Sequence, residues 1–112
     1  GGGATLDVTD AEFEALLGSG EAFVAMFHAP WCGHCKAAKP HFAKAAAAAP
    51  LPMVMLDGDK YRSVSKAQGL SGFPTVRAYA AKRTLGDHEG ERTAESFLAF
   101  AHEAAAAAGG GG

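Results

Sequence analysis

The 112-residue sequence predicts a single α/β domain in which helices cover both faces of one sheet. Short apolar runs that fit buried strands alternate with segments whose apolar residues recur every three or four positions, as in helices. Helix-capping residues and glycines mark the ends of these segments. The length suits one domain with its own hydrophobic core and leaves no room for a second domain.

The first predicted elements are a short strand over residues 5–8 and a helix directly after it. Thr9 and Glu12 have the spacing of a capping box, in which each side chain accepts the other residue's backbone N–H. Gly18 and Gly20 follow the helical pattern, and glycine often ends a helix. We therefore expect this helix to begin after Thr9 and to end at these glycines.

The next two elements are a buried strand and the longest helix of the chain. Residues 23–27 form an apolar run between turn residues, which is typical of a strand buried on both faces. The helix is predicted from Cys32 through the alanines that end at position 49. Pro40 lies inside this helix, removes one backbone hydrogen bond and is expected to kink it.

The second half of the chain holds the remaining strands and helices. Asp59 is expected to cap a helix that ends at Gly69, and Thr93 is expected to cap the last helix. The resulting order is β-α-β-α-β-α-β-β-α, which belongs to the α/β class. The strands of this half are predicted at residues 53–56, 75–79 and 83–88.

Composition and charge argue against two kinds of partner. The formal net charge is −2, and no run of Lys and Arg is present that would bind phosphates, so we expect neither nucleic acid nor a membrane as partner. No apolar stretch reaches the roughly 18 to 20 residues that span a bilayer. Residues 1–4 and 104–112 are low-complexity and are predicted to be flexible or frayed tails.

The chemistry of the chain is concentrated in one motif at the start of the longest helix, Trp31-Cys32-Gly33-His34-Cys35. A cysteine at a helix N-terminus faces free backbone N–H groups and the positive end of the helix dipole, and both favour the thiolate. We therefore expect Cys32 to attack disulfides and Cys35, one turn further, to resolve the mixed disulfide. His34 is expected to stabilise the Cys32 thiolate further, which makes the pair more oxidising.

A family resemblance rests on the buried strand and on two strings, A-P-W-C-G-H-C-K from Ala29 to Lys36 and G-F-P-T from Gly72 to Thr75. Together they resemble the catalytic domain of protein disulfide isomerases, over residues 5–103. The resemblance implies a thioredoxin fold, with a central mixed five-stranded sheet flanked by four helices. It also implies a cofactor-free oxidoreductase that forms and isomerises disulfides in protein substrates, in the endoplasmic reticulum lumen or the secretory pathway.

The same resemblance assigns site residues. Pro74 is the expected cis-proline beside the dithiol, and it forms the candidate substrate-binding surface with Phe73 and Trp31. Arg92 matches a family arginine thought to swing toward the active site and lower the pKa of the resolving cysteine. An ordinary trans bond at Pro74, and plain surface roles for Trp31 and Arg92, are the alternatives. The candidate catalytic residues are Cys32, Gly33, His34, Cys35 and Arg92.

The chain departs from the family pattern six residues before the first cysteine. Proteins of this family usually carry there a buried acid that moves a proton for the resolving thiol, and this sequence has Met26. We expect the resolving step to be slow, or to use water, Arg92 or another base. His28, on the same strand face as Met26, either fills a slot that is aromatic in the family or serves as that base.

Other functions stay open beside the oxidoreductase. One alternative is the substrate-facing domain of a larger sulfhydryl oxidase with a flavin module. Another is a client-binding module in which Met26 impairs redox turnover. Glutathione or an upstream oxidase is the expected redox partner, and a longer multidomain chain is compatible with these roles. A zinc site would need four ligands, and one C-x-x-C with scattered histidines lacks the usual spacing.

Overall fold

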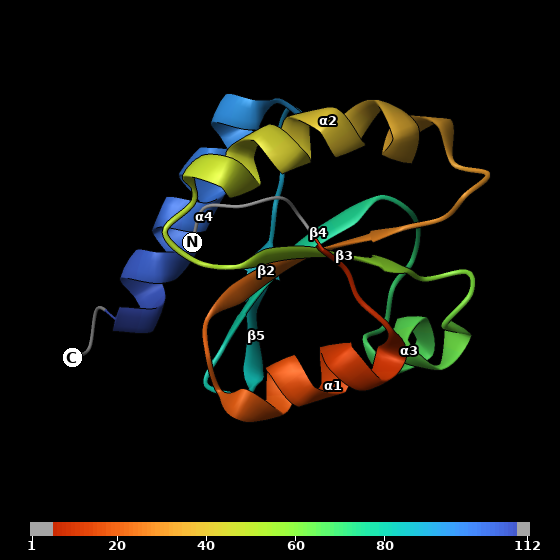
Figure 1. The fold of residues 1–112 in the computed structure, drawn as a ribbon, viewed down its shortest axis with the longest axis horizontal. Coiled ribbons are helices and arrows are strands. Elements are labelled where there is room, and N and C mark those ends of the chain that lie inside the picture. The colour runs from red at the N-terminus through yellow and green to blue at the C-terminus, as the bar shows by residue number, and fades with distance from the viewer. Residues whose placement is uncertain (1–5, 110–112) are drawn as a thin grey trace.

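The computed structural model describes residues 6–109, which contain the strands and helices in the predicted order (Figure 1). The segment 1–4, predicted to be flexible, lies outside the described residues, as do residues 110–112. None of the helices within residues 6–109 is long and apolar enough to cross a bilayer. The elements are β1 Leu6–Asp7, α1 Asp10–Ser19, β2 Phe23–His28, α2 Gly33–Ala48, β3 Met53–Asp57, α3 Arg62–Ala67, β4 Thr75–Ala80, β5 Arg83–Asp87 and α4 Ala94–Gly109.

The strands form one mixed sheet in the order β1-β3-β2-β4-β5. The pairs β1·β3 and β3·β2 are parallel, whereas β2·β4 and β4·β5 are antiparallel. Four strands have five or six residues, and β1 adds an edge of only two, so most of the sheet is four strands wide. All six residues of the central strand β2 are buried, which confirms the prediction made from residues 23–27.

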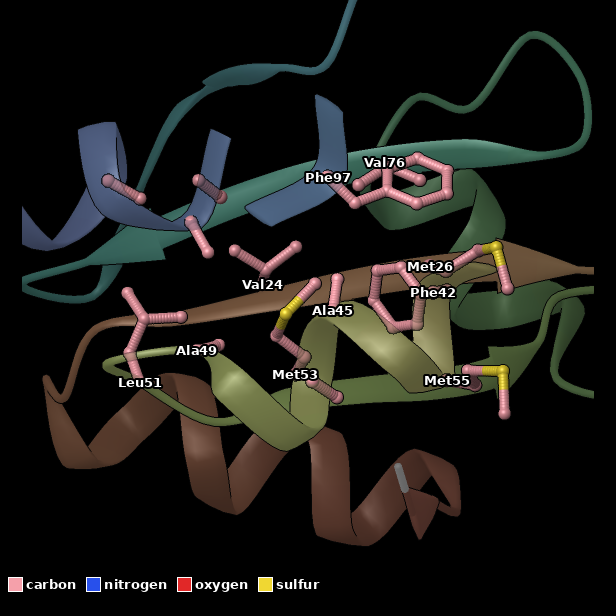
Figure 2. Packing of buried hydrophobic residues seen from close by; sticks show 14 of the residues in the cluster. Val24, Met26, Phe42, Ala45, Ala49, Leu51, Met53, Met55, Val76 and Phe97 are labelled. Atoms are coloured by element: carbon pink, nitrogen blue, oxygen red, sulfur yellow. The ribbon is translucent and has the colours of Figure 1, made fainter. Parts of the chain in front are cut away.

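Helices α2 and α4 cover one face of the sheet, and α1 and α3 cover the other (Figure 1). Successive residues of β2 point to opposite faces, so they contribute to two separate clusters of buried side chains. Val24 and Met26 lie in the cluster beneath α2 and α4, where Figure 2 shows Met26 close to Phe42 of α2. Phe23 lies in the other cluster, with Phe13 of α1. Burial of apolar surface stabilises the folded chain by about 25 cal/mol per Å². Because β2 is buried on both faces, its end is held firmly beneath α2.

The ends of α1 confirm the predicted capping box. The Glu12 N–H donates to Thr9 Oγ1 at 3.1 Å, and the Glu12 carboxylate accepts the Thr9 N–H at 2.8 Å. Gly20 has a left-handed conformation with φ of 80°, and its N–H donates to the carbonyl of Leu17. Gly18 lies inside the helix, so Gly20 is the glycine that ends it.

The prediction that Asp59 caps the third helix is wrong. Helix α3 begins at Arg62, and Tyr61 before it makes no side-chain capping bond. The Asp57 carboxylate instead accepts the N–H groups of Asp59 and Lys60 at 3.0 and 2.9 Å. An aspartate that bonds the backbone two residues ahead favours a turn, so this side chain closes the turn after β3. Asp59 pairs with the Arg62 side chain at the surface, 3.2 Å away.

Helix α4 begins after Thr93, whose hydroxyl accepts the N–H of Ser96 at 3.2 Å, as predicted. The helix continues to Gly109, so the prediction of a frayed segment from residue 104 is wrong as far as the structure describes the chain. Alanine has the highest helix propensity of all residues, and a low-complexity run of alanines therefore extends a helix readily. Ala104, on α4, is also buried in the cluster between the sheet and the helices α2 and α4.

Candidate active site

The dithiol lies where β2 is followed by α2. Cys32 is the N-cap residue of α2, with extended backbone at φ −88° and ψ 110°, and its Sγ accepts the N–H of Cys35 at 3.2 Å. The first N–H groups of a helix lack partners within it, so the sulfur here takes the place of the usual Ser or Asp oxygen. Gly33 and His34 are exposed in the first turn, and Pro40 lies inside the helix. The effect of His34 on Cys32 stays a prediction.

The two cysteines are free thiols that differ in access to solvent. Cys32 is 6% exposed, whereas Cys35 is fully buried. The Cys32 thiol donates a hydrogen bond to the carbonyl of Phe73 at 3.6 Å, and Ala29 and Phe73 pack against the pair. A substrate sulfur therefore meets Cys32 first, and Cys35 is placed to attack only a group already bonded to Cys32.

Burial raises the pKa of the Cys35 thiol from an ordinary 9.0 to about 11, and the hydrogen bond with the Cys32 side chain raises it as well. The backbone of Ala29 and the charge of Lys39 lower this pKa but do not offset the burial. A thiol with such a pKa is protonated almost completely at neutral pH. Because only a thiolate attacks a disulfide, Cys35 needs a proton acceptor before it reacts.

The predicted substrate-binding residues are neighbours beside Cys32. The peptide bond between Phe73 and Pro74 is cis, as predicted. Trp31 is 67% exposed, and its ring meets the Phe73 ring edge-on, with the centroids 5.9 Å apart. An exposed indole next to a half-buried phenyl ring offers an apolar surface to a peptide, although substrate binding by these three residues stays a prediction.

Gly58 is a buried residue that lies against Phe73, and its role was not predicted from the sequence. A Cβ at this position would lie 2.4 Å from the Phe73 ring and 2.6 Å from the Ser65 hydroxyl. The Gly58 N–H donates to the carbonyl of His28 at 2.8 Å, and the Ser65 hydroxyl donates to the Gly58 carbonyl at 2.7 Å. The missing side chain therefore makes room for the Phe73 ring. Only the folded chain brings these residues together, so no local sequence pattern indicates the contact.

Arg92 lies on the Pro74 side of the site. It is exposed in the segment between β5 and α4 and lines an open pocket of about 280 Å³ together with Pro74 and His88. Burial lowers the pKa of His88, and the positive charge of Arg92 lowers it further. The cation that acts on Cys35 is Lys39, and an effect of Arg92 on the resolving thiol stays a prediction.

Met26, at the position where the resemblance leads us to expect an acid, is fully buried in the core beneath α2. Its thioether is at most a weak acceptor and cannot take up a proton at neutral pH. His28, two residues later, is 5% exposed, and its Nε2 lies 3.0 Å from Oδ1 of Asp7. The Nδ1 of His28 is buried without a hydrogen-bond partner among the described residues.

A zinc site at the dithiol would need two ligands besides Cys32 and Cys35. Within residues 6–109, no three His, Cys, Asp or Glu side chains gather closely enough to hold a metal ion.

Comparison with known protein families gives a match to the family Thioredoxin over residues 4–103. The chain belongs to the thioredoxin family. Among solved structures, the first thioredoxin domain of mouse Protein disulfide-isomerase A4 is 27% identical to this thioredoxin-family chain. The two superpose with a TM-score of 0.74, over 86% of this chain and 71% of that domain's chain.

The curated relatives of this thioredoxin-family chain include proteins named as disulfide isomerases. Protein disulfide isomerase-like 2-1 of Oryza sativa subsp. japonica is 36% identical over 107 residues, which is 90% of this chain and 29% of the relative. Protein disulfide-isomerase A6 homolog of Caenorhabditis elegans is 35% identical over 114 residues, 95% of this chain and 26% of the relative. The chain thus spans less than a third of the length of these relatives.

Proposed function

We propose that this domain is a thiol-disulfide oxidoreductase that forms and isomerises disulfides in protein substrates. The observation that carries the proposal is the placement of the two thiols. Cys32 caps α2 and accepts the Cys35 N–H, and Cys35 is fully buried directly behind it. A helix N-terminus stabilises a thiolate, so the sulfur that a substrate meets is the more nucleophilic one.

The reaction runs through a mixed disulfide. When the reduced domain acts on a substrate disulfide, the Cys32 thiolate bonds to one substrate sulfur, and the other leaves as a thiolate that takes a proton from the solvent. Cys35 then attacks Cys32, the bond to substrate breaks, and the domain is left with a Cys32–Cys35 disulfide. When the oxidised domain meets two substrate thiols, the same steps run backwards and the substrate gains the disulfide.

The apolar surface beside Cys32 suits a protein substrate. Trp31, Phe73 and Pro74 lie beside Cys32 and would contact an extended protein segment around the reacting sulfur. Glutathione or an upstream oxidase would restore the oxidised dithiol. Disulfides persist in oxidising compartments, so an activity like the one that the relatives are named for fits a lumenal, secretory-pathway setting, such as the endoplasmic reticulum.

Refolding of a reduced or scrambled disulfide protein tests this function. The domain in a glutathione buffer should accelerate the return of client activity, and Cys32→Ser should abolish the acceleration. Cys35→Ser should still react once and remain bonded to the client, because the resolving sulfur is gone. A wild-type rate equal to that of Cys32→Ser would refute the proposal.

A client-binding module is the second candidate, and the Met26 position favours it. Without an acid there, Cys35 keeps its proton, since its pKa is about 11. Such a domain would hold clients as long-lived mixed disulfides and turn over rarely. The test compares the lifetimes of the mixed disulfides that the wild type and Cys35→Ser form with a client. Equal lifetimes would support this candidate.

A further inference from the structure

Residue His28 is the one buried polar residue within residues 6–109, and the reaction described above does not use it. Only 5% of its surface is exposed, and its Nδ1 is buried without a hydrogen-bond partner among those residues. Leaving a buried polar atom unpaired costs about 1 to 3 kcal/mol, so such an atom needs an explanation. A role in proton transfer provides one.

The hydrogen bond to Asp7 determines which ring nitrogen can accept a proton. Nε2 lies 3.0 Å from Oδ1 of Asp7, and a carboxylate oxygen only accepts hydrogen bonds. Nε2 therefore carries the hydrogen, and Nδ1 carries the lone pair. An aspartate and a histidine arranged in this way form a base whose free nitrogen is buried.

The sheet register places this base beneath the start of α2. Asp7 pairs with Met55, and Met55 pairs with Met26, so these residues share the face that α2 covers. His28 follows Met26 by two residues on the same face and ends β2. The next residue, Ala29, packs against Cys35 and bonds it through the backbone. The residue that follows the imidazole in the chain is therefore the one that contacts the buried thiol.

The other charged groups near this face do not compete for the role. Asp57 is the β3 partner of His28, but its Oδ1 already accepts the N–H groups of Asp59 and Lys60. From α2, the charged group that acts on Cys35 is Lys39, which donates and cannot accept a proton while charged. Oδ2 of Asp57 remains open, but that side chain is partly exposed, whereas the unpaired Nδ1 of His28 is buried.

We propose that His28, oriented by Asp7, is the proton acceptor for Cys35 in the resolving step. The inference rests on the proposed oxidoreductase function. The proton of the Cys35 thiol passes to Nδ1, directly or through one water, while the Cys35 sulfur bonds to Cys32. The bond between Cys32 and the substrate sulfur breaks, and the substrate thiolate leaves with that electron pair and recovers the proton from His28. Two electrons pass from the dithiol to the substrate, and His28 ends neutral as it began.

A nitroaromatic disulfide whose thiolate absorbs visible light separates the two steps. Attack by Cys32 releases one coloured thiolate at a rate proportional to reagent concentration. Attack by Cys35 on the mixed disulfide releases the second at a rate independent of that concentration. If the first release fails in the wild type, the proposed oxidoreductase function fails; if the first occurs, the second release tests His28 alone.

His28→Phe should leave the first release intact and slow the second by about 100-fold or more at neutral pH, the usual effect of losing a general base. The remaining rate should rise with pH toward the pKa of Cys35, about 11, whereas the wild-type rate should level off earlier. The solvent deuterium isotope effect on the second release should also change, which a purely structural role would not cause.

Two further variants keep the test decisive. Asp7→Asn changes an exposed side chain, keeps the ring in place and should slow the second release, because an amide can donate to Nε2 and move the hydrogen to Nδ1. His102→Gln, at an exposed position of α4, is the matched control and should match the wild type. A second release at the wild-type rate in both His28→Phe and Asp7→Asn would overturn the proposal; if His28→Phe does not fold, Asp7→Asn decides.

Discussion

The ring of Phe73 occupies the space where Gly58 has no side chain, and a Cβ on Gly58 would lie 2.4 Å from that ring. The same Phe73 accepts the Cys32 thiol hydrogen bond through its carbonyl. Phe73 therefore contacts both Gly58, which follows β3, and the reactive sulfur of Cys32. This link leads to a direct test.

Gly58→Ala should lower the unfolding free energy by roughly 1 to 3 kcal/mol, because the Phe73 ring and the Ser65 hydroxyl must both move to admit a methyl group. It should also change the rate at which Cys32 reacts with an alkylating reagent, since the Phe73 carbonyl moves with its ring. Gly72→Ala is the matched control, because a Cβ there would meet nothing within 4 Å. Equal urea midpoints for the two variants would contradict the steric argument.

The buried thiol of Cys35 should make the stability of the reduced domain depend on alkaline pH. Its pKa is about 11 in the folded chain against an ordinary 9.0, so the folded state holds the proton more tightly. The resulting stabilisation is complete below pH 9 and is lost as pH rises through about 11. Urea unfolding in a reducing buffer measures it, and Cys35→Ser should lack this component. Parallel curves for the wild type and the variant would show that the thiol does not contribute.

Replacing the buried Met26 by an acid should cost stability and speed the resolving step. Met26→Glu places a carboxyl at a fully buried position beneath α2, at a cost of roughly 1 to 3 kcal/mol at neutral pH. Burial raises the pKa of such a carboxyl, so the loss should be smaller at pH 4 than at pH 8. Release of the second coloured thiolate should be faster than in the wild type. An unchanged release rate would show that the missing acid does not limit Cys35.

Truncation after Glu103 should destabilise the domain even though the removed segment consists only of Ala and Gly. It deletes the last part of α4 and the buried Ala104. We expect a loss of about 1 kcal/mol or more, which lowers the melting temperature by several degrees in a domain of this size. Deleting only residues 110–112 keeps all of α4 and is the control. Equal melting temperatures for the two truncations would place the end of the folded domain at residue 103.

Much of the fold was predictable because its signals are local. Thr9 and Glu12 lie one helical turn apart, and the apolar run of β2 is contiguous, so their roles are visible in a few neighbouring residues. Cys32 at the start of α2 was predictable for the same reason. The alanine run of α4 was misjudged because a composition typical of disordered tails is also the best composition for a helix.

The missed parts of the site depend on contacts between distant segments. Asp7 and His28 meet only because β3 lies between their strands in the sheet. Gly58 and Phe73 meet only because the chain returns to the same end of the sheet after α3. Strand order decides both contacts, and a single sequence carries no direct record of strand order.

The hydrogen bond from the Cys35 N–H to Cys32 Sγ provides a spectroscopic probe of the redox state. Its acceptor is the atom that changes from thiolate to disulfide during the reaction, so the amide proton of Cys35 experiences a different charge in each state. In a ¹H-¹⁵N correlation spectrum, this amide should move more than others in α2 when the domain is titrated between reduced and oxidised glutathione. A single backbone resonance would then report the fraction of oxidised protein, without a label and without consuming the thiols.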